Sequence, residues 1–293
     1  MALPEQQPLV TVYIATHNRP ELLARAISSC VAQTYPHLEI IVVDDGSAPQ
    51  QAQLNQQLLL EYPQIKYLYL PVAGGAPVAR NTAIKMASGE FITGLDDDDE
   101  FKPERISELV QHWYSRTDCA FLCTGYTVIT GQQRLFNYAR RPRRINYQHL
   151  LYANVVGNQL FTLTSSLRAI DGFDAALPSC QDYDTWLRLA AAFGNGYRIG
   201  SCSYILHQEH QANRISDSSR REQGYQLLLE KHRKFMTAAQ LASHQVNYAL
   251  HNNTTFPWRA FFRLPLTQCL RVLKTLMVRR GWSLVLFSRG FPR

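Results

Sequence analysis

The first half of the chain alternates between two patterns of apolar residues. Short apolar runs rich in β-branched residues, typical of buried strands, cover residues 9–15, 38–43, 65–70 and 90–95. Between and after them, apolar residues recur at helical spacing over 20–31, 51–62, 76–87 and 103–114. This alternation predicts right-handed βαβ units and a largely parallel sheet, the α/β class. Ligands of such sheets bind at the carboxyl ends of the strands.

After residue 114 the pattern becomes irregular. Strands are predicted over 120–130, 134–138 and 197–206, and a helix over 182–193, so the sheet is expected to be mixed. The main domain is expected to span residues 1–215, followed by a C-terminal segment over 216–293.

Composition excludes several classes of protein. Hydrophobic residues make up 46% of the 293 residues and charged residues only 18%, which excludes disordered and coiled-coil chains. The six cysteines have no paired CxxC spacing, so neither a zinc site nor a disulfide framework is predicted.

No segment of the sequence predicts export or membrane crossing. The first ten residues lack the basic and apolar regions of a signal peptide, which predicts a cytoplasmic protein. No apolar stretch approaches the roughly 20 residues that span a bilayer, so any membrane contact is expected to be peripheral.

Charge is distributed unevenly along the chain. The formal net charge is +7, yet residues 1–230 carry 19 Lys and Arg against 23 Asp and Glu. The last acidic residue is Glu230, and the remaining 63 residues contain eleven Lys and Arg. An acidic body with a basic tail predicts two separate roles rather than one nucleic-acid surface.

Carboxylates follow two of the predicted strands. Asp44 and Asp45 end the second strand, and five acids, Asp96 to Glu100, follow the fourth. Because clustered like charges raise carboxylate pKa values and cost stability, we expect a cation to neutralise them. Oxygen ligands favour Mg²⁺ or Mn²⁺, which usually keep positions open for substrate phosphates. The alternative is a solvated acidic turn that caps the next helix, although a cap needs only one acid.

A glycine-rich loop lies between the two acidic segments. Gly74 and Gly75 precede a predicted helix, an arrangement whose backbone N–H groups often approach phosphates. The loop matches neither GxGxxG nor GxxxxGK[ST], which argues against a dinucleotide-binding dehydrogenase and a P-loop NTPase. Arg80, on the helix that leaves the loop, is a candidate to neutralise a nucleotide diphosphate.

Four segments together resemble family 2 glycosyltransferases with the GT-A fold, such as bacterial O-antigen and capsule enzymes. They are THNRPELLARAISSCVAQTYPHLEIIVVDDGS, GGAPVARNTAI, GEFITGLDDDDEFKPERI and QDYDTWLRLA, in the family's order and spacing. The resemblance covers roughly residues 9–215. It implies a Rossmann-like mixed sheet and an inverting transfer from a nucleotide-diphosphate sugar, assisted by a divalent metal.

The resemblance also assigns roles near the donor. Asp45 matches the carboxylate that contacts the nucleotide base, with Asp44 beside it, and Ala15, Thr16 and Asn18 lie near the same nucleotide. The family's DxD motif falls on Asp96, Asp97 and Asp98. Asp98 is the expected direct metal ligand and Asp96 the next, while Asp97 is assigned to the nucleotide sugar. Asp99 is expected to fix the loop through hydrogen bonds.

Asp182 matches the family's general base. It would accept the proton of an acceptor hydroxyl as that oxygen attacks the anomeric carbon, so an α-linked donor gives a β-glycoside. The preceding residue is Gln181 where the family usually has Glu, which leaves an acidic contact there in doubt. A plain helix N-cap is the alternative role for Asp182.

Other polar residues near these motifs stay open. Trp186 and Arg188 are explained equally by core packing or a salt bridge and by acceptor contact. In related enzymes a His after the last strand can complete the metal site, and His207 or His210 could do so. A satisfied surface or core His is the favoured interpretation.

The C-terminal tail has an amphipathic pattern. Leu266, Cys269, Leu270, Leu273, Leu276 and Met277 fall on one helical face, and aromatic residues precede them and follow at 282–287. A basic amphipathic segment with aromatics is typical of helices on anionic membranes. Docking of this helix on the catalytic domain is the alternative.

The functional expectation is transfer of a hexose from UDP-glucose or UDP-galactose to a lipid-linked saccharide such as GlcNAc-diphospho-undecaprenol. It would take place on the cytoplasmic face of the inner membrane, with no nucleic acid as partner. Two alternatives are a nucleotidyltransferase and a non-catalytic nucleotide-sugar-binding scaffold. The first strand is followed by Thr16-His17-Asn18-Arg19 rather than a glycine-rich loop, and all the acids are present, so both are disfavoured.

Overall fold

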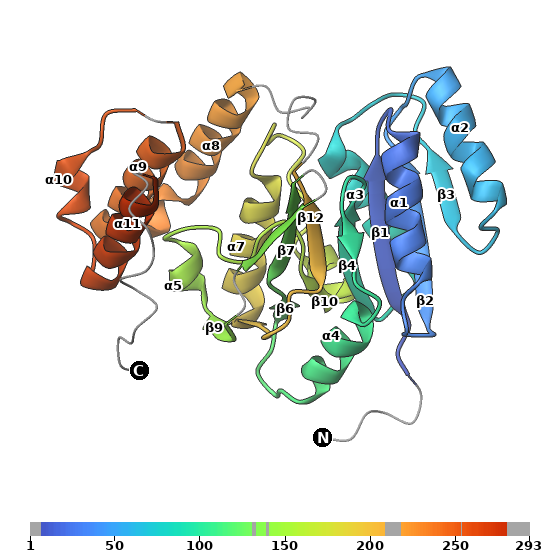
Figure 1. Cartoon of the computed structure of the whole chain (residues 1–293), viewed down its shortest axis with the longest axis horizontal. Helices are drawn as coiled ribbons and strands as arrows, with labels where there is room; N and C mark the ends of the chain where they lie inside the picture. Colours follow the sequence, from blue (N-terminus) through green and yellow to red (C-terminus); the bar gives the residue numbers. More distant parts are fainter. Residues whose placement is uncertain (1–6, 131–132, 139–140, 209–217, 253, 280–293) are drawn as a thin grey trace. The chain divides into compact units, whose positions relative to one another are not determined.

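The computed structural model describes residues 7–130, 133–138, 141–208, 218–252 and 254–279 (Figure 1). The chain divides into two compact units, one of residues 1–150 and 154–229 and one of residues 151–153 and 230–293. The domain boundary predicted near residue 215 falls within 209–217, outside the described residues.

An eight-stranded sheet forms the centre of the first unit. Its strands are β1 (Val10–Thr16), β2 (Leu38–Asp44), β3 (Lys66–Tyr69), β4 (Phe91–Asp96), β6 (Phe121–Cys123), β9 (Arg143–Ile145), β10 (Phe161–Leu163) and β11 (Gly196–Arg198). Their order is β3-β2-β1-β4-β10-β6-β11-β9. The first four strands pair in parallel, which confirms the predicted βαβ pattern. β10 runs antiparallel to β4 and β6, so the sheet is mixed, as predicted.

Helices connect the strands and cover both faces of the sheet (Figure 1). They are α1 (Pro20–Val31), α2 (Pro49–Leu60), α3 (Ala76–Met86), α4 (Arg105–Tyr114), α5 (Tyr147–Leu150), α6 (Thr164–Ala169) and α7 (Gln181–Phe193). A proline lies in the first two positions of α1, α2 and α3. Its missing N–H costs no helical bond there, and its fixed φ suits the first turn.

Strand alternation explains how one buried strand serves both faces. Val10, Val12 and Ile14 of β1 share a core cluster with Leu23 and Ile27 of α1, and all five are fully buried. Because successive side chains point to opposite faces, Tyr13 lies on the other side. There its ring meets Phe173 edge-on, with 6.3 Å between ring centroids.

A second sheet has the order β5-β12-β7-β8 and consists of β5 (Glu100–Phe101), β12 (Tyr204–His207), β7 (Tyr126–Thr130) and β8 (Gln133–Tyr138). The strands predicted over 120–130 and 197–206 are therefore each two strands. They break side by side: Gly125 donates its N–H to the carbonyl of Ser201 (2.8 Å), and Ile199 donates to Cys123 (2.9 Å). The ribbon of β6 and β11 thus continues as β7 and β12 in the second sheet, a bend that apolar periodicity does not reveal.

The second unit is helical. The helices are α8 (Ser218–His232), which begins in the first unit, η2 (Arg233–Phe235), α9 (Ala238–Asn252), α10 (Trp258–Phe261) and α11 (Leu266–Arg279). A small core joins Val246 of α9, Phe261 of α10 and Val272 of α11. Among the described residues, no helix is both long and apolar enough to cross a membrane.

Part of the apolar face predicted for the tail is used inside this unit. Cys269, Leu273 and Leu276 pack against the small core that contains residues of α9. Leu266 and Leu270 from the same predicted face are instead 75% and 56% exposed. The side chain of Met277, the residues 282–287 and His210 lie outside what the structure describes.

Candidate active site

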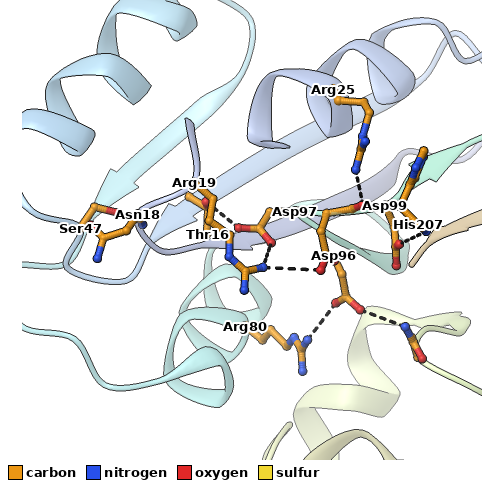
Figure 2. A network of polar contacts seen from close by, with 12 residues as sticks. Thr16, Asn18, Arg19, Arg25, Ser47, Arg80, Asp96, Asp97, Asp99 and His207 are labelled. Carbon is orange, nitrogen blue, oxygen red and sulfur yellow. Dashed lines mark hydrogen bonds and ion pairs between the residues drawn. The ribbon is translucent and has the colours of Figure 1, made fainter. Parts of the chain in front are cut away.

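Three neighbouring parallel strands end at one edge of the large sheet and bring the predicted site residues together (Figure 2). Thr16 at the end of β1 is opposite Asp44 of β2, and Ala15 is opposite Asp96 of β4. The acidic segments, which begin at Asp44 and Asp96, 52 residues apart in the sequence, therefore flank the same strand.

Asp44 is buried and fully engaged within the protein. It has no exposed surface, and its carboxylate accepts hydrogen bonds from the Ser47 N–H (2.9 Å), Asn55 Nδ2 (2.8 Å) and the Tyr67 hydroxyl (2.9 Å). Two carboxylate oxygens with three donors hold the turn after β2 in place.

Asp45 fastens the glycine-rich loop to the end of β2. Its two oxygens accept the N–H groups of Gly74 (2.8 Å) and Gly75 (2.7 Å). Gly75 has φ of +89°, which favours glycine. The glycine-rich loop, which is predicted to approach phosphates, is thus positioned by Asp45, which is predicted to contact the nucleotide base.

Asn18 ties the end of β1 to the turn after β2 (Figure 2). It has a positive φ of 57°, its N–H donates to Ser47 Oγ (2.8 Å), and its Oδ1 accepts from the Ala48 N–H (2.7 Å). Asn tolerates this left-handed conformation better than most residues. These contacts join the loop after β1 to the turn after β2, and the contacts of Asp45 join that turn to the glycine-rich loop.

Asp96 is held by three donors from two parts of the chain, α3 and the segment before β10. Arg80 of α3 makes an ion pair with it at 2.9 Å, Gln159 Nε2 donates at 2.9 Å, and Asn158 Nδ2 donates at 3.3 Å. The Tyr13 hydroxyl donates to Gln159 Oε1 at 2.9 Å, so the amide nitrogen of Gln159 faces Asp96. Charge-assisted contacts of this kind fix both the position and the charge of the carboxylate.

Asp97 and Asp98 face the loop after β1. The Thr16 hydroxyl donates to Asp97 at 2.8 Å, and Arg19 lies 3.1 Å from Asp97 and 3.5 Å from Asp98. Burial raises the pKa of Asp97 to about 6, and the charges of Asp98 and Asp96 add to the rise, while Arg19 and Thr16 oppose it. The Asp98 side chain is 23% exposed against 8% for Asp97, so Asp98 is the more accessible of the two.

Asp99 points away from the site into the second sheet. It is 1% exposed and accepts hydrogen bonds from the Tyr204 hydroxyl (2.9 Å) and the His207 N–H (3.0 Å). Burial and the charges of Asp96 and Asp98 hold its pKa well above the usual range. These contacts are of the kind predicted for Asp99, hydrogen bonds that fix the loop.

His207 is paired with Glu100. Its Nε2 lies 2.6 Å from Glu100 Oε1, and this hydrogen bond lowers the pKa of Glu100. Its Nδ1 is buried and forms no hydrogen bond with the part of the chain that the structure describes. His207 therefore contacts the end of the acidic segment through Glu100, and among the described residues its Nδ1 has no hydrogen-bond partner.

The oxygen donors of Asp96 and Asp98 fit a hard divalent cation. Both carboxylates are partly exposed, at 22% and 23%, whereas Asp97 and Asp99 are buried. Within the described residues, no three His, Cys, Asp or Glu side chains are grouped as a metal site. The chain would thus supply two carboxylate ligands, and the diphosphate of a donor would supply oxygens for the rest.

Asp182 lies in the first turn of α7. Asn154 Nδ2 is 3.3 Å from its Oδ2, and burial raises its pKa to about 6. The charge of Arg80 lowers this pKa and the charge of Asp96 raises it. The predicted base is thus close enough to the Arg80–Asp96 ion pair for both charges to affect it.

Trp186 and Arg188 have partners within the protein. Trp186 is fully buried and donates its Nε1–H to the carbonyl of Gly157 (2.9 Å). Arg188 pairs with Asp184 (2.7 Å) and also donates to backbone carbonyls. Packing and the salt bridge account for both side chains.

Sequence reasoning missed the polar segment before β10. Asn154, Asn158 and Gln159 supply the amide contacts to Asp182 and Asp96, and no motif marks them. It also missed Arg19, although that residue lies in the first of the four segments that resemble family 2. The available signal was the pair Asn158-Gln159 directly before the apolar residues Leu160 and Phe161.

A protein-family comparison decides the family. The model of glycosyl transferase family 2 matches residues 11–171. The chain belongs to glycosyl transferase family 2. It is a glycosyltransferase with the GT-A fold.

Two relatives with known names are similar to this chain. WcaA of Escherichia coli K12, assigned to colanic acid biosynthesis, is 33% identical over 89% of this chain and 94% of its own. WfgD of Escherichia coli, a UDP-Glc:α-D-GlcNAc-diphosphoundecaprenol β-1,3-glucosyltransferase, is 29% identical over 72% of this chain and 79% of its own.

Solved structures share the fold at low identity. Staphylococcus aureus TarS 1–349 in complex with UDP-GlcNAc has a TM-score of 0.63 and 16% identity, covering 93% of this chain and 92% of its own. The Pyrobaculum calidifontis mannosyltransferase PcManGT, in complex with GDP-Man and Mn²⁺, has a TM-score of 0.52 and 16% identity, covering 95% of this chain and 77% of its own.

Proposed function

We propose that this family 2 enzyme transfers a hexose from UDP-glucose or UDP-galactose to a lipid-linked saccharide such as GlcNAc-diphospho-undecaprenol. The product would be a β-linkage in O-antigen, capsule or lipopolysaccharide biosynthesis. The named activity of WfgD supports this substrate class, and the ligand of TarS supports a UDP-sugar. The observation that carries the proposal is the grouping of Arg80, Asp96 and Asp182 at the carboxyl edge of the sheet.

The donor would bind across the ends of β1, β2 and β4. In this proposal the nucleotide lies against Ala15, Thr16 and Asn18, with Asp45 toward the base and Asp44 supporting it from behind. Thr16 already positions Asp97 by a hydrogen bond, which would place that acid beside the nucleotide sugar. The guanidinium of Arg80 would face the diphosphate, since a planar cation suits phosphate oxygens.

Asp98 and Asp96 would hold the Mn²⁺ or Mg²⁺ ion. When bound, this ion would neutralise the negative charge that develops on the departing diphosphate. Arg80 would contribute positive charge beside it, and Gln159 and Asn158 would keep Asp96 oriented.

Asp182 would act as the general base. The acceptor hydroxyl oxygen forms a bond to the anomeric carbon, its proton moves to Asp182, and the bond to the diphosphate oxygen breaks with its electron pair. One such displacement inverts the anomeric centre. Asn154 would orient the carboxylate through its contact with Oδ2.

The same proposal assigns residues 1–215 to catalysis and residues 216–293 to peripheral contact with the cytoplasmic face of the inner membrane. Its support is the charge of the tail, where eleven Lys and Arg occur after the last acidic residue. A basic surface is attracted to anionic lipids.

Sugar transfer tests the assignment. The full chain is incubated with Mn²⁺, UDP-, GDP- or dTDP-sugars and a synthetic GlcNAc-diphosphate lipid, and release of the nucleoside diphosphate is measured. Asp98→Ala and Asp182→Asn should each lower kcat at least about 100-fold, because each removes a group used at the reacting centre. Asp118→Asn, at an exposed ion pair with Arg144, is the control and should leave kcat unchanged.

The products separate the alternatives. A nucleotidyltransferase would release pyrophosphate from a nucleoside triphosphate, and a scaffold would bind a nucleotide sugar without turnover. Either result, or full activity of both acid variants, would refute the proposal.

A further inference from the structure

Four large apolar side chains of the second unit are exposed at regular spacing. Trp258, Phe262, Leu266 and Leu270 are 57%, 77%, 75% and 56% exposed. The rings of Trp258 and Phe262 lie 6.4 Å apart, and Leu266 and Leu270 are one turn apart on α11. We refer to these four residues as the α10–α11 apolar group. Exposed apolar side chains on neighbouring parts of the surface commonly mark an interaction site.

The inner side of the same segment fixes how this group is presented. Phe261, next to Phe262, is 6% exposed, and Val272 of α11 is 2% exposed in the small core shared with α9. Cys269 and Leu273 pack against that core. Since these residues hold α10 and α11 against α9, the α10–α11 apolar group cannot turn inward without disrupting the core of the unit.

Exposed arginines follow three of the four apolar residues directly. Arg259 follows Trp258, Arg263 follows Phe262, and Arg271 follows Leu270, and all three are exposed. The sequence from 231 to 293 contains no Asp or Glu. The surface therefore offers apolar groups and positive charge together, without any acid of its own segment to neutralise them.

We propose that the α10–α11 apolar group and its arginines form the surface that contacts an anionic lipid bilayer. The proposal deepens the proposed function, on which it rests for the lipid-linked acceptor. The four apolar side chains enter the boundary between headgroups and acyl chains, and Arg259, Arg263 and Arg271 lie among the headgroup phosphates. Apolar burial and attraction to anionic lipid together give reversible interfacial binding.

Charge argues for a bilayer over a second copy of this chain. A symmetric dimer through this surface would bring the same arginines of two copies together without a carboxylate between them. Like charges placed directly opposite each other disfavour such an interface. An anionic bilayer supplies both the apolar phase and the counter-charge.

Vesicle co-sedimentation with the full chain tests the surface. One set of vesicles contains about three parts phosphatidylcholine to one part phosphatidylglycerol, and a second contains phosphatidylcholine alone. Phe262→Ser combined with Leu266→Ser should lower affinity for the anionic vesicles about tenfold, because two apolar side chains no longer leave water. Arg259→Gln combined with Arg263→Gln should lower that affinity about tenfold and leave binding to neutral vesicles unchanged.

Matched variants elsewhere in the chain serve as controls. Leu54→Ser combined with Leu60→Ser removes two exposed leucines of α2, which are 47% and 80% exposed. Arg141→Gln combined with Arg143→Gln removes two exposed charges of the first unit. Neither pair should change vesicle binding by more than about twofold.

The outcomes separate this surface from the transferase activity. Equal loss in a control pair, or no loss in the α10–α11 variants, would overturn the proposal. So would a dimer in solution that only the Phe262 and Leu266 changes dissociate while vesicle binding persists. Hydrolysis of a UDP-sugar without lipid should be the same in all of these variants. Vesicle binding without any turnover of donor would refute the proposed function and leave the surface intact.

Discussion

The pH dependence of transfer depends on the environment of Asp182. Burial raises its pKa from an ordinary value of 3.8 to about 6, with Arg80 opposing the rise and Asp96 adding to it. The other ionisable groups that interact with it are Tyr13, Tyr126, Tyr183 and Cys180, and burial raises the pKa of each of them. They are neutral near pH 6, so none of them changes charge as Asp182 titrates, whereas Asp97, whose pKa burial also raises to about 6, titrates in the same range.

The size of the effect follows from these values. A general base must be ionised, so kcat/KM for the donor should rise with pH through about 6. About a tenth of Asp182 is ionised at pH 5, about half at pH 6 and about nine-tenths at pH 7, which gives a tenfold rise between pH 5 and pH 7. An aspartate with an ordinary pKa would be more than about nine-tenths ionised at pH 5 and would give a nearly flat profile.

Initial rates at limiting UDP-sugar, measured from pH 5 to pH 8 at fixed ionic strength, check this expectation. Asp182→Asn should lose both the rate, by about 100-fold or more, and the rise with pH. Asp184→Asn is the matched control, since Asp184 lies on the same helix but pairs with Arg188, and it should keep the rise. A flat wild-type profile, or a full rate in Asp182→Asn, would refute the role of Asp182. A rise with pH that persists at a strongly reduced rate would instead report Asp97.

Three further changes test the structure of the large sheet. Burial acts to raise the pKa of Glu39, but hydrogen bonds from Lys66 and neighbouring donors outweigh it and lower this pKa to about 2. Because the pKa is lower in the folded than in the unfolded protein, the ionised Glu39 stabilises the fold above pH 4.5. This stabilisation is lost as the pH falls toward 2. Glu39→Gln should therefore lower the free energy of unfolding in urea by about 2 kcal/mol at pH 7, and the difference should shrink below pH 4.5. Asp44→Ala removes the acceptor of three buried donors and should cost about 3 kcal/mol in the same assay; a loss under about 1 kcal/mol would contradict its structural role. Gly94→Ala would place its Cβ 2.1 Å from Gln159 Oε1, so the free energy of unfolding should fall by about 1–3 kcal/mol and the melting temperature should fall with it. An unchanged melting temperature would contradict this expectation.

The sequence predicts which residues meet because strand order and strand ends determine it. Periodicity places Thr16, Asp44 and Asp96 at the ends of parallel strands, and parallel neighbours share one edge. The family motifs then add Asp182, which lies more than 80 residues from Asp96 in the sequence. The structure brings this distant residue within the electrostatic influence of Arg80.

The sequence could not predict the amide contacts or the break in two strands. Gln159 and Asn158 are placed by β10, whose antiparallel insertion next to β4 comes from long-range pairing. The change of sheet at Gly125 and Ser201 depends on two ribbons bending together, while the apolar alternation of each continues through the bend. Local patterns carry no information on either arrangement.

The acidic segments show why residue type alone overstates the charge available to a cation. Neighbouring side chains at a strand end point in different directions, so adjacent carboxylates enter different environments. Asp44 accepts hydrogen bonds from buried groups such as the Tyr67 hydroxyl, and Asp99 accepts hydrogen bonds from the Tyr204 hydroxyl and the His207 N–H. Asp97 accepts from Thr16 and pairs with Arg19. Asp96 and Asp98 also have arginine partners, Arg80 and Arg19, but their side chains are 22% and 23% exposed, so a cation can reach their carboxylates. Substitution of Asp98 should therefore lower metal-dependent activity, whereas substitution of Asp44 should mainly lower stability.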